Sequence, residues 1–127
     1  MEKSKKIFIC LPINEKNWLR QEKRADELVL RVRKAGYVPV NPFDISFELN
    51  EKFEVSGGKP CHNDYLAEDI RELLECDGIL LDHDIKTSDD CKKILAVAQA
   101  MAEEKGSKFT IFHTKEQWDY IKKQYII

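Results

Sequence analysis

The sequence predicts a single α/β domain, and three observations support this prediction. Four short apolar runs, rich in β-branched and aromatic residues, alternate with longer segments in which apolar residues recur with helical spacing. The chain of 127 residues is long enough for one hydrophobic core and too short for two. Strands that alternate with helices form a parallel sheet covered on both faces. We therefore expect one three-layer, flavodoxin- or Rossmann-like domain over residues 1–127, with a parallel sheet of four or five strands.

The first half of the chain predicts two strands and one helix. Residues 6–13, KIFICLPI, form an apolar run that ends near a proline and predicts the first strand. Residues 17–36 show helical spacing of apolar residues before a glycine, which predicts a helix and its end. Residues 37–43, YVPVNPF, predict a second short strand. Residues 44–60 contain two adjacent glycines and a proline and show no clear period, so they predict a long loop.

The middle of the chain predicts a helix followed by a buried strand. Residues 61–76 place their apolar residues on one helical face, and either Asn63 or Asp64 is a suitable N-cap. Residues 77–84, DGILLDHD, then form a continuous apolar run between acidic residues. Such a run is typical of a strand that is buried on both faces.

The last part of the chain predicts two more helices around a strand. Residues 91–106 form a helix that stops at a glycine, and residues 108–113, KFTIFH, form a strand. Residues 114–125 predict a final helix that begins at a threonine N-cap. With right-handed connections, these elements give the strand order 2-1-3-4.

This strand order predicts where a ligand binds. Ligands of open parallel sheets lie at the carboxyl ends of the strands, where the winding direction reverses. The first and third strands flank that point, so residues 11–13 and 82–90 form the expected rim of the pocket. Neither a G-x-G-x-x-G nor a G-x-x-x-x-G-K-[ST] motif follows the first strand, which argues against dinucleotide and P-loop sites.

Charge and hydropathy narrow the class of partner. The net charge is -2 with Lys and Glu interleaved, which argues against a nucleic acid polymer because duplex binding needs a basic face. The apolar runs are too short to span a bilayer, so we expect no membrane partner. The basic start MEKSKK precedes an apolar run that lacks a cleavage site, and we expect a cytoplasmic protein.

The cysteines argue against a metal centre. Four of them are widely spaced with no C-x-x-C pair, so we expect free thiols and neither a metal nor a cofactor. They are Cys10, Cys61, Cys76 and Cys91. Cys91 falls near the first turn of a predicted helix, where the helix dipole lowers the pKa of a thiol.

Four segments carry a resemblance to a known family. KIFICLPI, GYVPVNPFDI, YLAEDIRELLECDGILL and TSDDCKK occur in this order and cover nearly the whole chain. The most specific feature is Tyr65-x-x-x-Asp69 followed by Leu73 and Cys76-Asp77. These segments resemble the nucleoside 2-deoxyribosyltransferase-like family, especially its small bacterial and phage members of uncharacterised function. The resemblance implies a nucleoside or nucleotide as ligand, chemistry at the base–sugar bond, and a homo-oligomer.

The resemblance also implies a nucleophile that this sequence lacks. In the family a loop of the form S-x-G-[AC]-x-x-E supplies a glutamate that attacks the anomeric carbon of the sugar. When Ser88 is matched to the serine, Asp90 falls at the glycine, Cys91 at the small residue and Ile94 at the glutamate. An isoleucine side chain cannot attack a sugar, so the ordinary mechanism of the family is not open to this chain.

Three residues are candidates for catalysis. Asp69 matches an acidic position that faces the nucleoside in the family, although an exposed helix aspartate is also commonly just solvated. Asp90 lies one turn before Ile94 on the same helical face and could replace the glutamate, or could simply be a charge favoured by the helix dipole. Tyr65 could orient a neighbouring carboxylate or cover the edge of the core.

A wider set of residues is expected to contact the ligand: Pro12, Ile13, Arg20, Arg24, Phe43, Asp44, His83, Ser88, Cys91 and Ile94. Arg20 and Arg24 match a region where the family has a basic residue near the sugar or phosphate, yet both could be ordinary exposed arginines. His83 could exchange a proton near neutral pH or be a turn residue. Ser88 could help to hold a phosphate, which the adjacent carboxylates would repel.

Three functional hypotheses follow. The first is an active N-glycosidase or deoxyribosyltransferase that uses an unusual nucleophile or an activated water. The second is a catalytically inactive protein that binds or senses a nucleoside or nucleotide on the same scaffold. The third is an interaction module that uses its helical faces and keeps only a vestigial pocket. The first hypothesis predicts release of free base. The second predicts saturable binding without turnover, and the third predicts neither.

Overall fold

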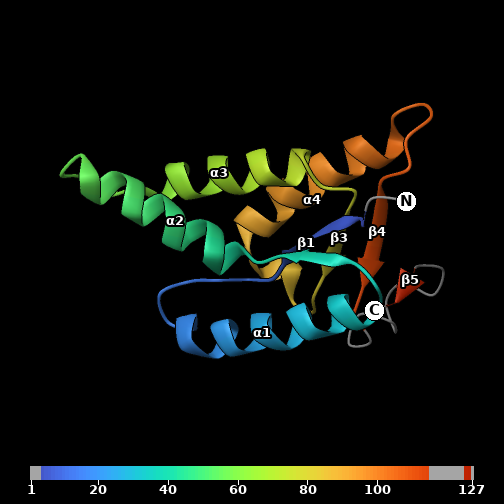
Figure 1. Cartoon of the computed structure of the whole chain (residues 1–127), viewed down its shortest axis with the longest axis horizontal. Helices are drawn as coiled ribbons and strands as arrows, with labels where there is room; N and C mark the ends of the chain where they lie inside the picture. Colours follow the sequence, from blue (N-terminus) through green and yellow to red (C-terminus); the bar gives the residue numbers. More distant parts are fainter. Residues whose placement is uncertain (1–3, 115–124, 127) are drawn as a thin grey trace.

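A parallel sheet forms the centre of the computed structural model, which describes residues 4–114, 125 and 126 (Figure 1). Its five strands have the order β2-β1-β3-β4-β5, and each neighbouring pair is parallel. The strands are β1 (Lys6–Cys10), β2 (Val38–Val40), β3 (Gly78–Leu81), β4 (Thr110–His113) and β5 (Tyr125–Ile126). The predicted α/β class, the parallel sheet and the order of the first four strands are thus confirmed.

Helices cover both faces of this sheet. They are α1 (Trp18–Lys34), α2 (Pro42–Val55), α3 (His62–Leu74) and α4 (Asp89–Glu103), with a short 3-10 turn η1 (Ile85–Thr87) before α4. Helix α1 lies on one face, and α3 and α4 lie on the other (Figure 1). This is the three-layer arrangement that the alternating sequence pattern predicts.

Two apolar clusters form the core, one on each side of the sheet. On the α1 side, Ile7 and Ile9 of β1 pack with Leu28 of α1. On the other side, Phe8 of β1 and Ile79 of β3 pack with residues of α3 and α4. Successive side chains of a strand point to opposite faces, so the continuous apolar runs of β1 and β3 supply both clusters.

Gly78 lets two strands approach closely at the start of β3. A Cβ atom on this residue would lie 2.7 Å from the carbonyl oxygen of Thr110 and 2.9 Å from Cδ1 of Ile7. Both distances are shorter than van der Waals contact allows. The position therefore requires glycine for packing between β1, β3 and β4.

The predicted loop over residues 44–60 is wrong, because most of it belongs to helix α2. The side chain of Asn41 caps this helix by accepting a hydrogen bond of 3.0 Å from the amide of Phe43. Pro42 occupies the first turn, where its missing N–H costs nothing. The helix buries Phe43, Ile45 and Leu49. The sequence predicts a strand over residues 37–43, whereas Asn41 and Pro42 begin this helix.

Two other predicted boundaries change. Helix α3 is capped at Cys61 and not at Asn63 or Asp64, and the carboxylate of Asp64 accepts a hydrogen bond of 2.8 Å from the Cys61 amide. That bond lowers the pKa of Asp64. The predicted last helix, residues 114–125, falls mostly outside the described residues, but Tyr125 at its end belongs to β5.

The helices are too short or too polar to cross a bilayer, as far as residues 4–114, 125 and 126 are concerned.

Candidate functional site

Two cavities lie near the carboxyl ends of β1 and β3, where the sequence predicts a ligand; the larger is lined by α1 and the smaller by α3 and α4. The smaller one has a volume of about 50 Å³ and the larger one about 590 Å³. The segments 11–13 and 87–88 contribute to both cavities, each with different residues. Pro12 and Thr87 face the larger cavity, whereas Ile13 and Ser88 face the smaller one.

The smaller cavity contains Asp69, the carboxylate predicted from the resemblance. Atom Oδ1 of Asp69 is buried and has no hydrogen-bond partner among the described residues. Burial raises the pKa of this carboxyl to about 7, with further increases from the negative charges of Asp90, Glu68 and Glu72. A carboxyl group with this pKa exchanges its proton near neutral pH.

Asp90 and Ser88 enter the same cavity from the start of α4. The Ser88 hydroxyl oxygen accepts a hydrogen bond of 3.2 Å from the amide of Cys91 and so caps the helix. Asp90 Oδ1 lies 3.0 Å from Nε2 of His62, a largely exposed residue at the start of α3. The Cys91 amide is thus already engaged by Ser88, while Asp90, which contacts His62, lines the same cavity as Asp69.

Ile94 also lines this cavity and is only 5% exposed. The position that the resemblance aligns with the family nucleophile therefore faces the cavity, but it presents a hydrocarbon side chain. One turn earlier on α4, Asp90 is the nearest carboxylate on that helix. The cavity thus combines two carboxyl groups with apolar walls from β1, α2 and α4.

Two cysteines complete the wall of the smaller cavity. Cys10 ends β1, Cys91 lies in the first turn of α4, and both are almost fully buried. The neighbouring Cys91 thiol raises the pKa of Cys10, and burial raises it further. The Cys10 thiol and the Ser88 side chain lower the pKa of Cys91, against the opposing effect of burial.

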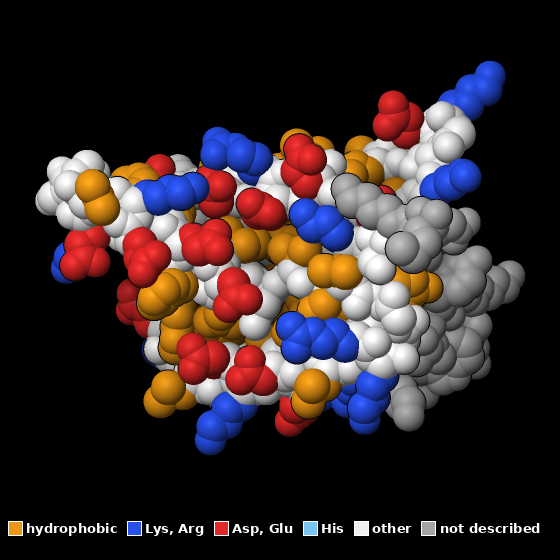
Figure 2. All heavy atoms as spheres, in the orientation of Figure 1, with side chains coloured by type: hydrophobic (Ala, Val, Ile, Leu, Met, Phe, Trp, Pro, Cys, Tyr) orange, Lys and Arg blue, Asp and Glu red, His pale blue; other side chains and the backbone are white. Residues whose placement is uncertain are grey.

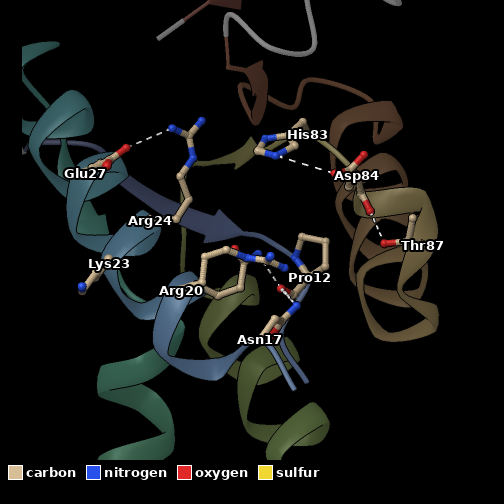
Figure 3. Close-up of a pocket in the computed structure, with 10 residues that line it drawn as sticks. Pro12, Asn17, Arg20, Lys23, Arg24, Glu27, His83, Asp84 and Thr87 are labelled. Carbon is tan, nitrogen blue, oxygen red and sulfur yellow. Dashed lines mark hydrogen bonds and ion pairs between the residues drawn. The ribbon is translucent and has the colours of Figure 1, made fainter. Parts of the chain in front are cut away.

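The larger cavity lies between α1 and the segment that follows β3 (Figure 3). Arg20, Lys23 and Arg24 line it from α1, and His83 and Asp84 line it from the other side. Figure 3 shows two ion pairs at its border: Arg24 with Glu27 at 3.1 Å and His83 with Asp84 at 3.6 Å. Its mixed charge and its size suit a polar ligand.

Asp82 holds the residues of this border in place; it lies within the predicted rim 82–90, but sequence analysis assigns it no individual role. Its carboxylate is fully buried and accepts two hydrogen bonds from Arg24, 2.9 Å from Nε and 2.8 Å from Nη2. The Thr114 hydroxyl donates a third at 3.1 Å, and Nδ1 of His83 lies at 3.1 Å. Burial acts to raise the pKa of Asp82, but the hydrogen bonds from Arg24 and His83 outweigh it and lower the pKa.

Asp82 could have been found from the sequence by one signal. It is the first polar residue after the buried strand β3, and an acid at the end of a central strand needs a cationic partner when it is buried. That partner is Arg24, which we described as an arginine that could be simply exposed. Its side chain is only 14% exposed, although it still lines the larger cavity.

Three other predicted site residues lie apart from both cavities. Phe43 is buried in the core and contacts Trp18 edge to face, with ring centroids 4.9 Å apart. Tyr65 donates a hydrogen bond to the side-chain oxygen of Asn50 and so ties α3 to α2. Asp44 is exposed in the first turn of α2.

No group of three or more His, Cys, Asp and Glu side chains suited to a metal ion occurs within the part of the chain that the structure describes. The chain matches no protein-family model, and neither a curated protein nor a solved structure matches it. These observations define an α/β protein with two cavities near the carboxyl ends of β1 and β3.

Proposed function

We propose that the protein binds a nucleoside or nucleotide at the carboxyl edge of β1 and β3 and hydrolyses its base–sugar bond. The observation that carries the proposal is Asp69, a carboxyl group with a pKa of about 7 that shares a cavity with Asp90. The resemblance to the nucleoside 2-deoxyribosyltransferase-like family, which rests on the segments around Tyr65–Asp77 and Ser88–Ile94, supports the choice of ligand.

Two carboxyl groups in one cavity suit the cleavage of an N-glycosidic bond. The protonated carboxyl of Asp69 donates its proton to the leaving base as the bond to the anomeric carbon breaks. Asp90 accepts a proton from the water molecule that attacks this carbon. The products are the free base and the free sugar, and the net reaction consumes one water.

Ile94 favours hydrolysis over transfer of the sugar to a second base. Transfer in the family passes through a covalent bond between the sugar and a glutamate, and the isoleucine side chain offers no atom that could form such a bond. Direct attack by water needs no covalent intermediate. We therefore expect release of base without exchange.

The two cavities together offer the room that such a ligand needs. A volume of about 50 Å³ is too small for a nucleoside, because pockets for ligands of this size commonly exceed about 300 Å³. The larger cavity of about 590 Å³ carries the exposed cations Arg20 and Lys23, which attract a phosphate. In our proposal the scissile bond reaches the smaller cavity and the remaining part of the ligand occupies the larger one.

The test is release of free base from a panel of 2′-deoxynucleosides and their 5′-monophosphates, read by chromatography. The wild-type protein should release base, and Asp69→Asn should lower the rate by about 100-fold because the proton donor is lost. Asp26→Asn removes an exposed carboxylate of α1 and serves as the matched control. Equal rates for Asp69→Asn and the wild type would refute the role of Asp69.

Binding without turnover is the second candidate, and Ile94 together with the small cavity favours it. This candidate predicts saturable binding of a nucleoside or nucleotide in calorimetry and no release of base even after long incubation. Loss of binding in Arg20→Ala, with no base released by the wild type, would support it over hydrolysis.

A homo-oligomer is part of the proposal, as the resemblance implies. Helix α2 runs outward from the sheet alongside α3 (Figure 1), and it exposes 64% of Phe47 and 91% of Val55. Figure 2 shows hydrophobic side chains on one face of the molecule, bordered by several acidic side chains. Contact between copies through α2 would remove Phe47 and Val55 from water.

A further inference from the structure

His83, which lines the larger cavity, has one ring nitrogen fixed by a buried carboxylate. Its Nδ1 lies 3.1 Å from Oδ1 of Asp82. The same oxygen accepts hydrogen bonds from Arg24 and Thr114, so it is an acceptor and Nδ1 of His83 carries the proton. In a neutral imidazole with its proton on Nδ1, the second nitrogen, Nε2, is an acceptor. The proposed hydrolysis gives this acceptor no role.

Asp84 places a second acceptor next to this nitrogen. Its Oδ2 lies 3.6 Å from Nε2 of His83, which is longer than a hydrogen bond. The contact is an ion pair when the imidazole is doubly protonated, and in the neutral ring both atoms are acceptors that do not bond to each other. The two residues therefore present a pair of acceptors at the border of the cavity (Figure 3).

The backbone of Asp84 is held in an uncommon conformation. Its φ of 63° lies in the left-handed region, which residues other than glycine rarely adopt. The carbonyl oxygen of Asp84 accepts hydrogen bonds of 2.6 Å from the Thr87 hydroxyl and 2.9 Å from the Thr87 amide. Residues in such conformations persist where their neighbours hold them, and they cluster at sites that hold ligands in place. The acceptor pair is thus fixed before a ligand arrives.

The facing wall of the cavity supplies cations. Arg20 and Lys23 line it from α1, and both are exposed. Figure 3 shows Lys23 on the helix that lies across the cavity from His83 and Asp84. A ligand with an anionic group at one end and hydroxyl donors at the other complements both walls. The volume of about 590 Å³ is large enough for a sugar phosphate.

We propose that the larger cavity binds the ribose 5-phosphate part of a ribonucleotide. Nε2 of His83 and Oδ2 of Asp84 accept hydrogen bonds from the 2′- and 3′-hydroxyls, and Arg20 and Lys23 bind the phosphate. A vicinal diol offers two O–H donors side by side, which matches two adjacent acceptors, whereas 2-deoxyribose offers only one donor there. The inference rests on the nucleotide ligand of the proposed function and adds the identity of its sugar. 2′-Deoxynucleotides keep one of the two hydrogen bonds and remain weaker ligands.

The test is an NMR titration of the isotope-labelled protein with ribose 5-phosphate and, separately, with 2-deoxyribose 5-phosphate. The dissociation constant of ribose 5-phosphate should be about 10-fold lower, because its second hydroxyl adds a hydrogen bond to a fixed acceptor, and the ring signals of His83 should shift. Neither probe contains a base, so the result does not depend on hydrolysis. Equal affinities, or no binding of ribose 5-phosphate, would overturn the proposal, while the base-release assay judges the proposed function separately.

The same labelled protein reveals the tautomer of His83 without any ligand or substitution. Long-range proton–nitrogen correlations in mildly alkaline solution should show the proton on Nδ1 and none on Nε2. A ring that carries its proton on Nε2 could not accept a hydrogen bond there, and this result would overturn the proposal.

Two substitutions test the acceptors themselves. Asp84→Gly removes the carboxylate and suits the positive φ, and His83→Phe keeps a flat ring without Nε2. Loss of the Asp84 charge acts equally on both phosphates, so the readout is the ratio of the two affinities. This ratio should fall from about 10 to about 1 in the variant that lacks the partner of the 2′-hydroxyl.

The matched control is Asp26→Asn, which removes an exposed carboxylate of α1 that does not line the cavity. It should leave the ratio of the two affinities unchanged. A ratio that stays at about 10 in both Asp84→Gly and His83→Phe would overturn the proposal.

Discussion

In the folded protein the Asp69 carboxyl keeps its proton at pH values at which the same carboxyl is ionised in the unfolded chain. Its pKa is raised to about 7, mainly by burial, whereas an unfolded aspartate has a pKa of about 4. The folded state therefore binds one more proton between these two values. The stability that Asp69 contributes is fully present below the unfolded pKa and is lost as the pH rises through about 7.

Asp69→Asn should accordingly stabilise the protein at alkaline pH. The amide stays neutral and has nearly the same shape, so the free energy of unfolding at about pH 8 should exceed that of the wild type by on the order of 2 kcal/mol. Near pH 4 the two proteins should agree, since the wild-type carboxyl is then protonated in the folded state. Urea unfolding followed by circular dichroism at both pH values measures the difference. A difference that is independent of pH would contradict a raised pKa.

Arg24 should contribute strongly to the stability of the folded protein, because it pairs with the buried carboxylate of Asp82 at the border of the larger cavity. Arg24→Met leaves the buried carboxylate of Asp82 without its two strongest hydrogen bonds, and we expect a loss of about 3 kcal/mol in the free energy of unfolding. Because the pKa of Asp82 is lowered in the folded protein, this stabilisation is present above the pKa of the unfolded carboxyl and is lost as the pH falls through the folded value.

The matched control for this experiment is Arg20→Met, which removes an exposed arginine of the same helix. It should change the free energy of unfolding by less than about 0.5 kcal/mol. Equal effects of the two substitutions in urea unfolding would show that the Asp82 contact contributes nothing.

Some residues of the site could be predicted from the sequence, and others could not. Asp69, Ser88 and Cys91 line one cavity, as expected for residues that follow the ends of parallel strands or face them from a helix. The contact between Asp82 and Arg24 joins positions 58 residues apart, so no local pattern reports it. Nor can spacing show that Cys10 and Cys91 line the same cavity.

At the scale of the elements, the packing of β3 depends on Gly78. Gly78→Ala places a methyl group 2.7 Å from the carbonyl oxygen of Thr110, so the strands must separate. We expect a loss of about 2 kcal/mol in the free energy of unfolding, typical of overpacking in a core. Gly58→Ala is the control, because its methyl group would have only an ordinary contact of 3.9 Å with Phe53. Thermal unfolding that fails to separate the two variants would show that β3 tolerates the methyl group.

The elements of the sheet were easier to predict than helix α2. Strands β1 and β3 are buried on both faces, and their apolar runs are unmistakable. Helix α2 lies at the end of the molecule and packs on α3, so its apolar residues do not follow one clean helical face. Its start signal, Asn41 followed by Pro42, is also a common end of a strand. Capping geometry, which the sequence does not show, decides whether Asn41 and Pro42 start a helix or end a strand.

At the scale of the whole molecule, the exposed side chains of α2 predict self-association. Phe47→Glu places a charge on the proposed contact surface, so it should weaken the dimer at least 10-fold in sedimentation velocity experiments over a range of concentrations. Leu19→Glu changes a residue of α1 that is 76% exposed and should leave the dimer intact. A wild-type protein that stays monomeric at high concentration would contradict this part of the proposal.

The place of the two cavities in the whole fold agrees with the edge that the strand order predicts, because the order of parallel strands fixes where the winding reverses. The division into two separate cavities did not follow from the sequence. That division depends on which way Pro12 and Ile13 point at the end of β1, and on the turn that separates Thr87 from Ser88. Such side-chain directions arise from tertiary packing and leave no periodic pattern in the chain.

The most direct test of the central claim, that Asp69 donates a proton at a nucleoside site, is the pH dependence of base release. With the best substrate of the panel, the wild-type rate should be highest in mildly acidic solution and fall as the pH rises through about 7, because the donor loses its proton. Asp69→Asn should be slow throughout. A wild-type rate that stays constant from about pH 5 to about pH 9, or the same profile in Asp69→Asn, would contradict the account.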